Sequence, residues 1–449
     1  MRACILKTSI GEHLWTRRAR RKRRNNPPTC FLPEPSRASR GFGRLFFRGA
    51  VGLSKLASTD SARRATGVMT TAINIEDLRE QARRRLPRVV FDYLDGGAEA
   101  EVTLRRNRSS FTDIVLTPRI LKGGSVDLTL ELFGETYSKP FFIGPTGLNG
   151  LYWPQGDLHL AAAAERSGVG FTVSTASNTT LEEIAGKSKG PLWFQLYPWG
   201  QGAFAEALID RAQASGYSAL VLTVDSLVGG KRERDLRHGF AHEIRIGPRT
   251  VLDGLLHPAW LSSVWLGPHR PRLENLLDFV GNSASDSELA EFTRSQRNPE
   301  FSWDDVRRIR EKWKGPLLIK GIMCPEDAID AQRAGVDGVI VSNHGGRQLD
   351  GAPATIDVLA DIIAALDRKF PVLLDGGIRR GSDIVKALTL GAKGVLLGRA
   401  PLYGLAAQGE AGVSRALSIL EDEMTRTMTF VGARSVSAVS GVNVETRRS

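Results

Sequence analysis

Eight short apolar runs, most of them separated by amphipathic helical stretches, constrain the fold of this chain more than any other feature. Fully apolar strands that alternate with helices are typical of a parallel sheet covered by helices on both faces. Eight such units in about 250 residues match the size of a closed (β/α)8 barrel. The runs lie at residues 141–147, 168–175, 191–197, 219–225, 316–321, 338–344, 371–377 and 394–399, and the clearest helical stretches at 157–167, 204–216, 325–335 and 382–391. We therefore predict an α/β fold built on a single TIM barrel. An open sheet that binds a dinucleotide has no support, because no Gly-x-Gly-x-x-Gly fingerprint follows the first run.

A long insertion is predicted after the fourth strand, at about residues 230–305, because the connection there is far longer than one helix needs. Residues 254–267 carry no formal charge and hold leucines and two tryptophans. Such a segment suits a helix that lies on a lipid surface, with membrane contact through 250–270. A lid that packs on its own barrel is an equally good interpretation. The polar stretch 282–297 is expected to be mobile.

The net charge of +12 comes from an N-terminal extension. Residues 1–68 hold 16 Lys and Arg against 3 Asp and Glu, which leaves 69–449 near neutral. We predict a disordered extension over 1–68 and one barrel domain over 69–449, which begins with a helical segment at 75–86 capped by Asn74. The extension could be a nucleic-acid-binding arm, a transit peptide or a stretch outside the natural protein. We favour the last, because Met69 immediately precedes the first helix, and we predict no nucleic-acid partner.

Cysteine content and hydropathy indicate the compartment. Two of the three cysteines lie in the extension, which leaves Cys324 alone and favours a reducing environment. No run of 18 or more uncharged apolar residues is present, so no bilayer span is expected. We predict a cytoplasmic protein that can lie on the inner face of the cell membrane.

The most informative motif follows the sixth apolar run and reads Ser342-Asn343-His344-Gly345-Gly346-Arg347-Gln348-Leu349-Asp350. The two glycines allow a tight turn and the close approach of a flat ligand. An imidazole that can take a proton near neutral pH, next to a guanidinium that binds a carboxylate, suits chemistry on a small acid. By itself the motif could also be a surface loop with a chance histidine and arginine.

This motif and a second one, Asp375-Gly376-Gly377-Ile378-Arg379-Arg380-Gly381, resemble the FMN-dependent L-2-hydroxy-acid dehydrogenases and oxidases. The resemblance extends from about Asn74 to about Gly441. Within the family, residues 144–150, 174–178 and 232–236 are most similar to bacterial (S)-mandelate dehydrogenase, and L-lactate dehydrogenase is also close. Ala176 stands where glycolate oxidase has a bulky tryptophan, which favours a larger substrate.

The resemblance implies the catalytic roles. His344 would be the base, and Asp225 would orient its imidazole and stabilise its cation. Arg232 and Arg347 would bind the substrate carboxylate through parallel donors. Tyr93 would bond to that carboxylate, and Tyr197 would lie near the substrate hydroxyl. Lys320 would stabilise negative charge on the reduced flavin.

The resemblance also implies FMN as the cofactor, with no metal. Contacts to the flavin and ribityl chain are assigned to Pro145, Thr146, Gly147, Ser174, Gln195, Thr223, Lys320 and Ser342. The phosphate would lie where the last two strands end, as in many barrels. Its ligands are assigned to Asp375, Gly376, Gly377, Arg379, Gly398 and Arg399.

The predicted activity is oxidation of an L-2-hydroxy acid, with a mandelate-like substrate favoured, to the 2-oxo acid. The electrons would pass to a quinone-type acceptor, and the enzyme would be a homotetramer. The alternatives within the family are an L-lactate dehydrogenase and an oxidase that uses O2. A barrel isomerase acting on a diphosphate is a different class, and it would have no use for the set of His344, Arg232 and Arg347.

Overall fold

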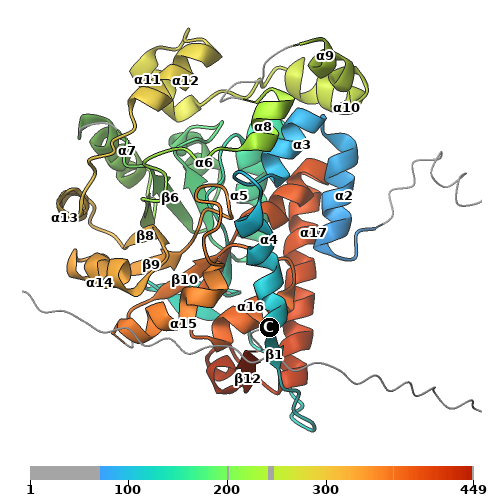
Figure 1. Cartoon of the computed structure of the whole chain (residues 1–449), viewed down its shortest axis with the longest axis vertical. Coiled ribbons are helices and arrows are strands. Elements are labelled where there is room, and N and C mark those ends of the chain that lie inside the picture. The colour runs from blue at the N-terminus through green and yellow to red at the C-terminus, as the bar shows by residue number, and fades with distance from the viewer. Residues whose placement is uncertain (1–70, 200–201, 241–246, 368, 447–449) are drawn as a thin grey trace, which may run out of the picture. The chain divides into compact units, whose positions relative to one another are not determined.

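The structure, a computed structural model, describes residues 71–199, 202–240, 247–367 and 369–446 (Figure 1). The predicted extension at 1–68 lies outside the described residues.

Eight parallel strands form a closed barrel in the order β10-β11-β4-β5-β6-β7-β8-β9. Each strand falls within one of the predicted apolar runs or overlaps it, so the predicted barrel is confirmed. Strand β11 closes the barrel by pairing with β4, Val395 opposite Phe141. The strands are β4 (Phe141–Ile143), β5 (Phe171–Ser174), β6 (Leu192–Leu196), β7 (Ala219–Thr223), β8 (Leu317–Ile322), β9 (Gly338–Val341), β10 (Val372–Asp375) and β11 (Gly394–Leu397).

The amino-terminal end of the barrel is plugged. Inside it, Phe142 stacks on Trp193 with ring centroids 4.7 Å apart, and Tyr137 meets Phe142 edge-on. Tyr137 belongs to a hairpin of β2 (Leu130–Leu132) and β3 (Glu135–Tyr137), whose buried side chains join the barrel interior. Because this end is filled, ligands can reach the strands only from their carboxyl ends, where barrel sites are normally found.

Helices cover the outside of the barrel. They are α5 (Gly156–Ser167), α6 (Leu181–Lys187), α7 (Ala203–Ala214), α13 (Trp303–Lys312), α14 (Pro325–Arg333), α15 (Thr355–Ala365), α16 (Gly381–Thr389) and α17 (Arg399–Val431). The last of these contains a break at Gln408 and Gly409, which have non-helical backbone angles. A short strand β1 (Ile114–Leu116) pairs with β12 (Val444–Thr446) near the C-terminus.

The predicted N-terminal helical segment is present as α2 (Ile75–Arg85), α3 (Arg88–Asp95) and α4 (Val102–Ser109). The side chain of Asn74 caps α2 by accepting a hydrogen bond of 2.9 Å from the amide of Asp77. Helix α2 packs along α17 (Figure 1). This contact holds α3, which carries Tyr93, at the mouth of the barrel.

The insertion between β7 and β8 is mostly helical. It contains α8 (Glu233–His238), α9 (Pro248–Leu255), α10 (Pro258–Trp260), a π-helical turn at Leu261–Trp265, a 3-10 turn at Glu274–Leu276, α11 (Leu277–Val280) and α12 (Asp286–Ser295). Helix α12 was not predicted from the sequence, because the stretch 282–297 is polar. The features that indicate this helix are the capping box of Ser285 with Glu288 and the apolar pair Leu289 and Ala290, which is buried.

The insertion exposes large apolar side chains in and next to its uncharged part. Leu252, Leu255, Leu256 and Leu266 are each at least 60% exposed. Within the part of the chain that the structure describes, no helix combines the length and apolarity that crossing a bilayer requires. Leu252 and Leu255 lie on α9, and Leu256 and Leu266 directly follow α9 and the π-helical turn. These short segments suit contact with a surface.

Candidate active site

A histidine–aspartate pair lies at the carboxyl ends of β9 and β7. Nδ1 of His344 is 2.8 Å from Oδ1 of Asp225. Burial alone would raise the pKa of the Asp225 carboxyl, but the imidazole and the Lys320 ammonium outweigh it and hold that pKa below its usual value. Burial also lowers the pKa of His344, and Asp225 offsets this only in part. At neutral pH the imidazole is therefore neutral, Nδ1–H donates to Asp225, and Nε2 is left as a proton acceptor.

The backbone at His344 has an unusual conformation that turns the chain sharply. His344 has φ +58°, and the two following glycines have φ +63° and +74°. A Cβ at Gly346 would lie 2.6 Å from the amide nitrogen of Leu104, so only glycine fits there. Backbone strain at a non-glycine residue is concentrated at functional sites, where surrounding contacts maintain it.

Lys320 is a buried cation held by two partners. It is 4% exposed, and its Nζ lies 3.1 Å from Oδ2 of Asp375 and 2.8 Å from the hydroxyl of Ser342. Burial lowers the pKa of this ammonium, but the carboxylates of Asp375 and Asp225 more than compensate and raise it above the ordinary value. Lys320 therefore keeps its positive charge at the mouth of the barrel.

Two arginines face the same space, and within the described residues neither forms an ion pair with a carboxylate, although the charge of Asp235 acts on both. Arg347 donates from one nitrogen to the carbonyls of Tyr93 and Gly96, both at 2.8 Å, and lies 5.0 Å from the Tyr93 ring centroid. The Nε of Arg232 is buried, and no hydrogen-bond partner for it exists among the described residues. Burial and the charge of Arg347 lower the pKa of Arg232. Two close, buried cations are costly unless an anion binds between them.

Two tyrosines complete this set. Tyr93 stacks on Phe240 with centroids 4.2 Å apart, and Tyr197 stacks on Trp199 at 4.7 Å. Burial, with the charge of Asp225, raises the pKa of Tyr197 to about 12, so its hydroxyl remains a donor. All seven residues predicted to be catalytic therefore lie together. Six line one or both of two cavities, and Asp225 supports His344 from behind.

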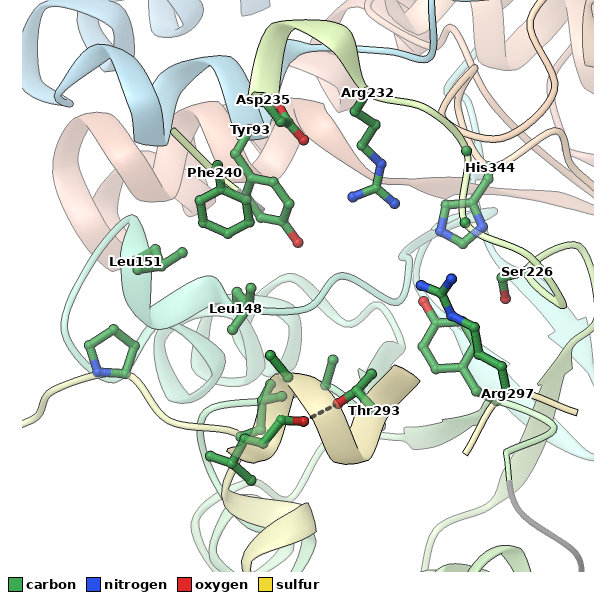
Figure 2. A pocket seen from close by; sticks show the side chains of 18 of the residues that line it. Tyr93, Leu148, Leu151, Ser226, Arg232, Asp235, Phe240, Thr293, Arg297 and His344 are labelled. Carbon is green, nitrogen blue, oxygen red and sulfur yellow. Dashed lines mark hydrogen bonds between the residues drawn. The ribbon is translucent and has the colours of Figure 1, made fainter. Parts of the chain in front are cut away.

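The larger cavity has a volume of about 360 Å³ and extends from the reactive groups to the insertion (Figure 2). Tyr93, Arg232 and His344 line one end of it, and Thr293 of α12 lies at the other. The insertion also contributes Trp265, Leu273, Leu289 and Ala290 to its walls. These lining residues were not predicted, because no sequence spacing connects them with the strand ends.

The smaller cavity has a volume of about 170 Å³ and lies over the ends of β10 and β11. Ten of the predicted cofactor residues line it: Pro145, Thr146, Gly147, Lys320, Asp375, Gly376, Gly377, Arg379, Gly398 and Arg399. The other four lie buried in the adjoining barrel mouth: Ser174, Gln195, Thr223 and Ser342. The two cavities share Tyr93, Ala176, Tyr197, Arg232 and His344, so they meet beside the base.

The groups around the smaller cavity include buried polar atoms that lack a protein partner. Within the described residues these are Nε2 of Gln195, Oγ1 of Thr223, Oδ1 of Asp375 and Nε of Arg379. At the far end a Cβ on Gly377 would lie 1.9 Å from the carbonyl oxygen of Asn107, so this position requires glycine. Unpaired buried donors and acceptors normally have a bound partner, and a glycine turn beside an arginine suits a phosphate.

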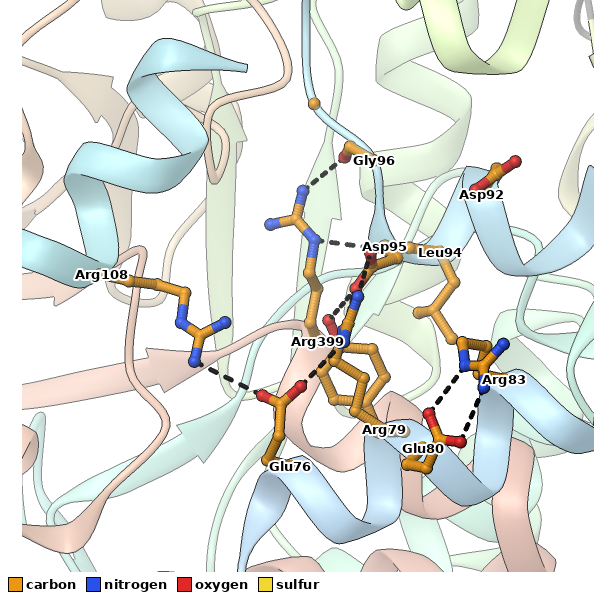
Figure 3. Close-up of polar contacts among 12 residues, drawn as sticks. Glu76, Arg79, Glu80, Arg83, Asp92, Leu94, Asp95, Gly96, Arg108 and Arg399 are labelled. Atoms are coloured by element: carbon orange, nitrogen blue, oxygen red, sulfur yellow. Dashed lines mark hydrogen bonds and ion pairs between the residues drawn. The ribbon is translucent and has the colours of Figure 1, made fainter. Parts of the chain in front are cut away.

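Arg399, which was predicted to bind the phosphate, also forms hydrogen bonds with backbone carbonyls. Its guanidinium donates to the carbonyls of Leu94 (3.2 Å), Gly96 (2.6 Å) and Gly345 (2.9 Å) (Figure 3). These bonds tie α3 to the turn after His344. The assignment of Arg399 to the phosphate stays a prediction, and Arg379, with an unpaired Nε, is the more available donor.

Two buried acids near the site were missed by our reading of the sequence. Asp95 binds Arg79 (2.6 Å), Arg234 (3.0 Å) and the hydroxyl of Tyr403 (2.7 Å), which joins α2, α8 and α17 (Figure 3). Asp235 lines the larger cavity, and burial raises the pKa of its carboxyl. Asp235 lies in a charged run and Asp95 follows Asp92 by three residues, so sequence alone gives no reason to choose one acid over another.

Comparison with known proteins gives consistent matches over most of the chain. The family model described as FMN-dependent dehydrogenase matches residues 82–446. The chain is 45% identical to (S)-mandelate dehydrogenase of Pseudomonas putida over 369 residues, which cover 82% of this chain and 92% of that protein. It is also 45% identical to an L-lactate dehydrogenase of Stenotrophomonas maltophilia over 368 residues, 81% of this chain and 96% of the relative. The crystal structure of the monotopic membrane protein (S)-mandelate dehydrogenase matches with a TM-score of 0.81 at 43% identity, and the match covers 84% of this chain and 100% of that one.

Proposed function

Because this chain belongs to the FMN-dependent dehydrogenase family, we propose that it oxidises an L-2-hydroxy acid to the 2-oxo acid, with a mandelate-like acid as the substrate. One observation carries the proposal. A neutral imidazole backed by a carboxylate lines the smaller cavity together with two half-buried guanidinium groups, Arg232 and Arg347, which form no ion pair with a carboxylate among the described residues. This arrangement suits a ligand that has both an anionic group and a removable proton.

The smaller cavity suits FMN as the cofactor. Unpaired atoms of Gln195 and Thr223 would meet the polar edge of the ring system, and Gly376, Gly377 and Arg379 would hold the phosphate. When bound, FMN supplies the acceptor for the two electrons that leave the substrate. The ammonium of Lys320, fixed by Asp375, would stabilise the negative charge that reduction brings.

The substrate carboxylate would bind between Arg232 and Arg347, with the hydroxyl of Tyr93 as an additional donor. Hydrogen bonds to charged groups contribute about 1.5–3 kcal/mol each. Since the two guanidinium groups come from different elements, they fix the orientation of the acid as well as its position. The hydroxy-bearing carbon is then held beside His344.

His344 would take the proton that the hydroxy acid loses. Its Nε2 is the free acceptor because Nδ1–H is bonded to Asp225. Protonation makes the imidazole a cation next to an ionised carboxylate, and this pair stabilises the charge that forms during the reaction. Tyr197, whose hydroxyl stays protonated, would hydrogen-bond to the substrate oxygen.

A quinone-type acceptor at a membrane would remove the electrons from the enzyme. Exposed leucines on the insertion support a peripheral position, and the (S)-mandelate dehydrogenase whose crystal structure is cited above is described as a monotopic membrane protein. The proposed location is the cytoplasmic face of the cell membrane, and the proposed assembly is a homotetramer. An L-lactate dehydrogenase is the second candidate, because the identity to that group is equally high.

The test is anaerobic mixing of the purified flavoprotein with L- and D-2-hydroxy acids while the flavin absorbance is recorded. We expect L-mandelate to bleach the flavin and D-mandelate to leave it unchanged. The His344→Gln variant should keep its flavin and bleach about 10²–10⁴-fold more slowly, the usual contribution of a general base. Bleaching of this variant at the wild-type rate would exclude His344 as the base.

A further inference from the structure

We propose that α12 of the insertion forms a side-chain chamber for the substrate and selects 2-hydroxy acids whose side chain is at least as large as an aromatic ring. The side-chain chamber is the part of the larger cavity lined by Leu273, Leu289, Ala290 and Thr293. The inference rests on the proposed function and adds a substrate class and the residues that determine it.

The chamber is continuous with the site of the chemistry. The same cavity is lined by His344 and Arg232 at one end and by Thr293 at the other (Figure 2). A substrate whose carboxylate lies on Arg232 and whose reacting carbon faces His344 would therefore point its side chain toward α12. His344 and Arg232 also line the smaller cavity, which is proposed to hold the flavin. The larger cavity is therefore the space left for the substrate side chain.

The volume of the cavity argues against a small side chain. A cavity of about 150 Å³ is enough to hold benzene, whereas this one measures about 360 Å³. It therefore has room for a ring in addition to the carboxylate and the reacting carbon. The methyl group of lactate would leave most of the chamber unfilled, and its apolar lining would gain few dispersion contacts.

The walls of the chamber are chemically suited to an apolar group. Leu289 and Ala290 are buried, and Leu148 of the loop after β4 and Phe240, which follows α8, face the same cavity. The hydroxyl of Thr293 donates to the carbonyl of Leu289 at 2.7 Å. Because this hydroxyl is satisfied within its own helix, Thr293 adds no unpaired polar group to the wall.

Several contacts fix α12 relative to the barrel. Arg272 donates to the carbonyls of Asn282 (2.9 Å) and Ala284 (2.7 Å), just before the helix begins. The carbonyl of Arg272 in turn accepts a bond of 2.6 Å from Asn178, in the loop after β5. Phe292 of α12 meets Phe204 of α7 edge-on at 5.7 Å. The chamber wall is therefore anchored to the barrel on two sides, as a specificity element must be.

The experiment fills the chamber and compares two substrates. We would measure kcat/KM for L-mandelate and for L-lactate with the wild type, with Thr293→Phe and with Ser295→Phe. Ser295 lies on the same helix but is exposed, so it matches the added ring without entering the cavity. We expect the mandelate-to-lactate ratio to fall about 10–200-fold in Thr293→Phe, the range for a change of fit in an apolar pocket. Ser295→Phe should leave the ratio within about twofold of wild type, which is far below that range.

A variant that enlarges the side-chain chamber tests the same wall without crowding the helix. Thr293→Ala should raise kcat/KM for a two-ring acid such as L-2-naphthylglycolate relative to L-mandelate, while flavin content and circular dichroism match the wild type. An unchanged ratio in both Thr293 variants would overturn the inference, and so would a wild-type enzyme that prefers L-lactate to L-mandelate. If no 2-hydroxy acid bleaches the wild-type flavin, the proposed function itself fails, which is a different result.

Discussion

The barrel wall of the larger cavity, which contains His344, is held by buried charges, whereas its insertion wall, formed by α12, is held by a helix cap, a few apolar contacts and the hydrogen bonds of Arg272 to backbone carbonyls. On the barrel side, His344 bonds to Asp225 at 2.8 Å, and the charge of the buried Lys320 acts on that carboxylate. On the insertion side, Ser285 caps α12, and Leu289 and Ala290 provide the buried face.

This difference separates chemistry from selectivity. Groups at strand ends are held rigidly by the sheet, which keeps a base and its orienting carboxylate in the geometry that proton transfer requires. A helix on a loop insertion can change its side chains without disturbing those groups. We therefore expect substitutions in the barrel wall to lower kcat for every substrate and substitutions in the insertion wall to change mainly the ratio between substrates.

The largest effect is expected for Asp225→Asn. Asparagine can still accept a hydrogen bond from Nδ1 of His344, but it cannot stabilise the imidazolium that forms when the base takes its proton. We expect kcat to fall about 10²–10⁴-fold with all 2-hydroxy acids, measured as the anaerobic rate of flavin bleaching. The control is Asp210→Asn, an exposed acid on α7 that pairs with Lys312. A loss confined to one substrate would contradict the separation of the two walls.

A somewhat smaller loss is expected for Arg232→Met. Arg232 begins the insertion but faces the same end of the cavity as His344. Removing one of two half-buried cations deprives the substrate carboxylate of a charged donor, which costs about 2–5 kcal/mol, or about 30–5,000-fold in kcat/KM. Arg237 on α8 is exposed, pairs with Glu233 and lines neither cavity, so Arg237→Met should have little effect. The loss should be equal for L-mandelate and L-lactate, because both carry the same carboxylate. A change in their ratio comparable to that of Thr293→Phe would show that the two walls are not independent.

The barrel wall was predictable from sequence because its residues follow apolar strands. Asp225 and His344 each end an apolar run, and a closed barrel brings the ends of such runs to one mouth. The catalytic roles of Asp225, His344 and Arg232 came from the family resemblance. Spacing alone could not distinguish Arg232 from Arg234 as the ligand of the substrate carboxylate. The structure shows why they differ: Arg234 binds Asp95 and Glu101, while Arg232 faces the cavity.

The insertion wall was not predictable in the same way. Thr293 reaches the cavity because Arg272 and Asn178 position α12, and the bond between Asn178 and Arg272 joins residues 94 positions apart in the chain. The repeating pattern of eight strands does not predict where a helix of the insertion lies relative to the barrel. Its polar composition also concealed a helix whose buried face is formed by only a few apolar side chains.

The pH dependence of kcat/KM should be determined by His344 and Asp225 in the barrel wall and not by α12. Burial lowers the pKa of His344 below its ordinary value of 6.5. The base works in its neutral form, so kcat/KM should be constant near neutral pH and should decrease only when the pH falls below 6.5, about tenfold per pH unit once the base is protonated. Thr293→Phe should show the same profile as wild type, since among the described residues no hydrogen bond or ion pair joins α12 to His344 or Asp225. An acidic limb centred above pH 6.5 would mean that Asp225 dominates over burial.

The smallest effect on catalysis is expected for the triple variant Leu252→Ser, Leu255→Ser and Leu256→Ser. These side chains are 60%, 61% and 71% exposed, so their loss should change the bleaching rate less than about twofold. Burial of a leucine in an apolar phase is worth about 1.5–3 kcal/mol, so even partial insertion of three should change vesicle binding more than tenfold. The measurement is cosedimentation with phosphatidylglycerol vesicles, and the control is Ile120→Ser with Leu121→Ser, which are exposed outside the insertion. Slower bleaching with unchanged vesicle binding would assign the leucines to a lid over the cavity. The insertion would then take part in the chemistry that we attribute to the barrel alone.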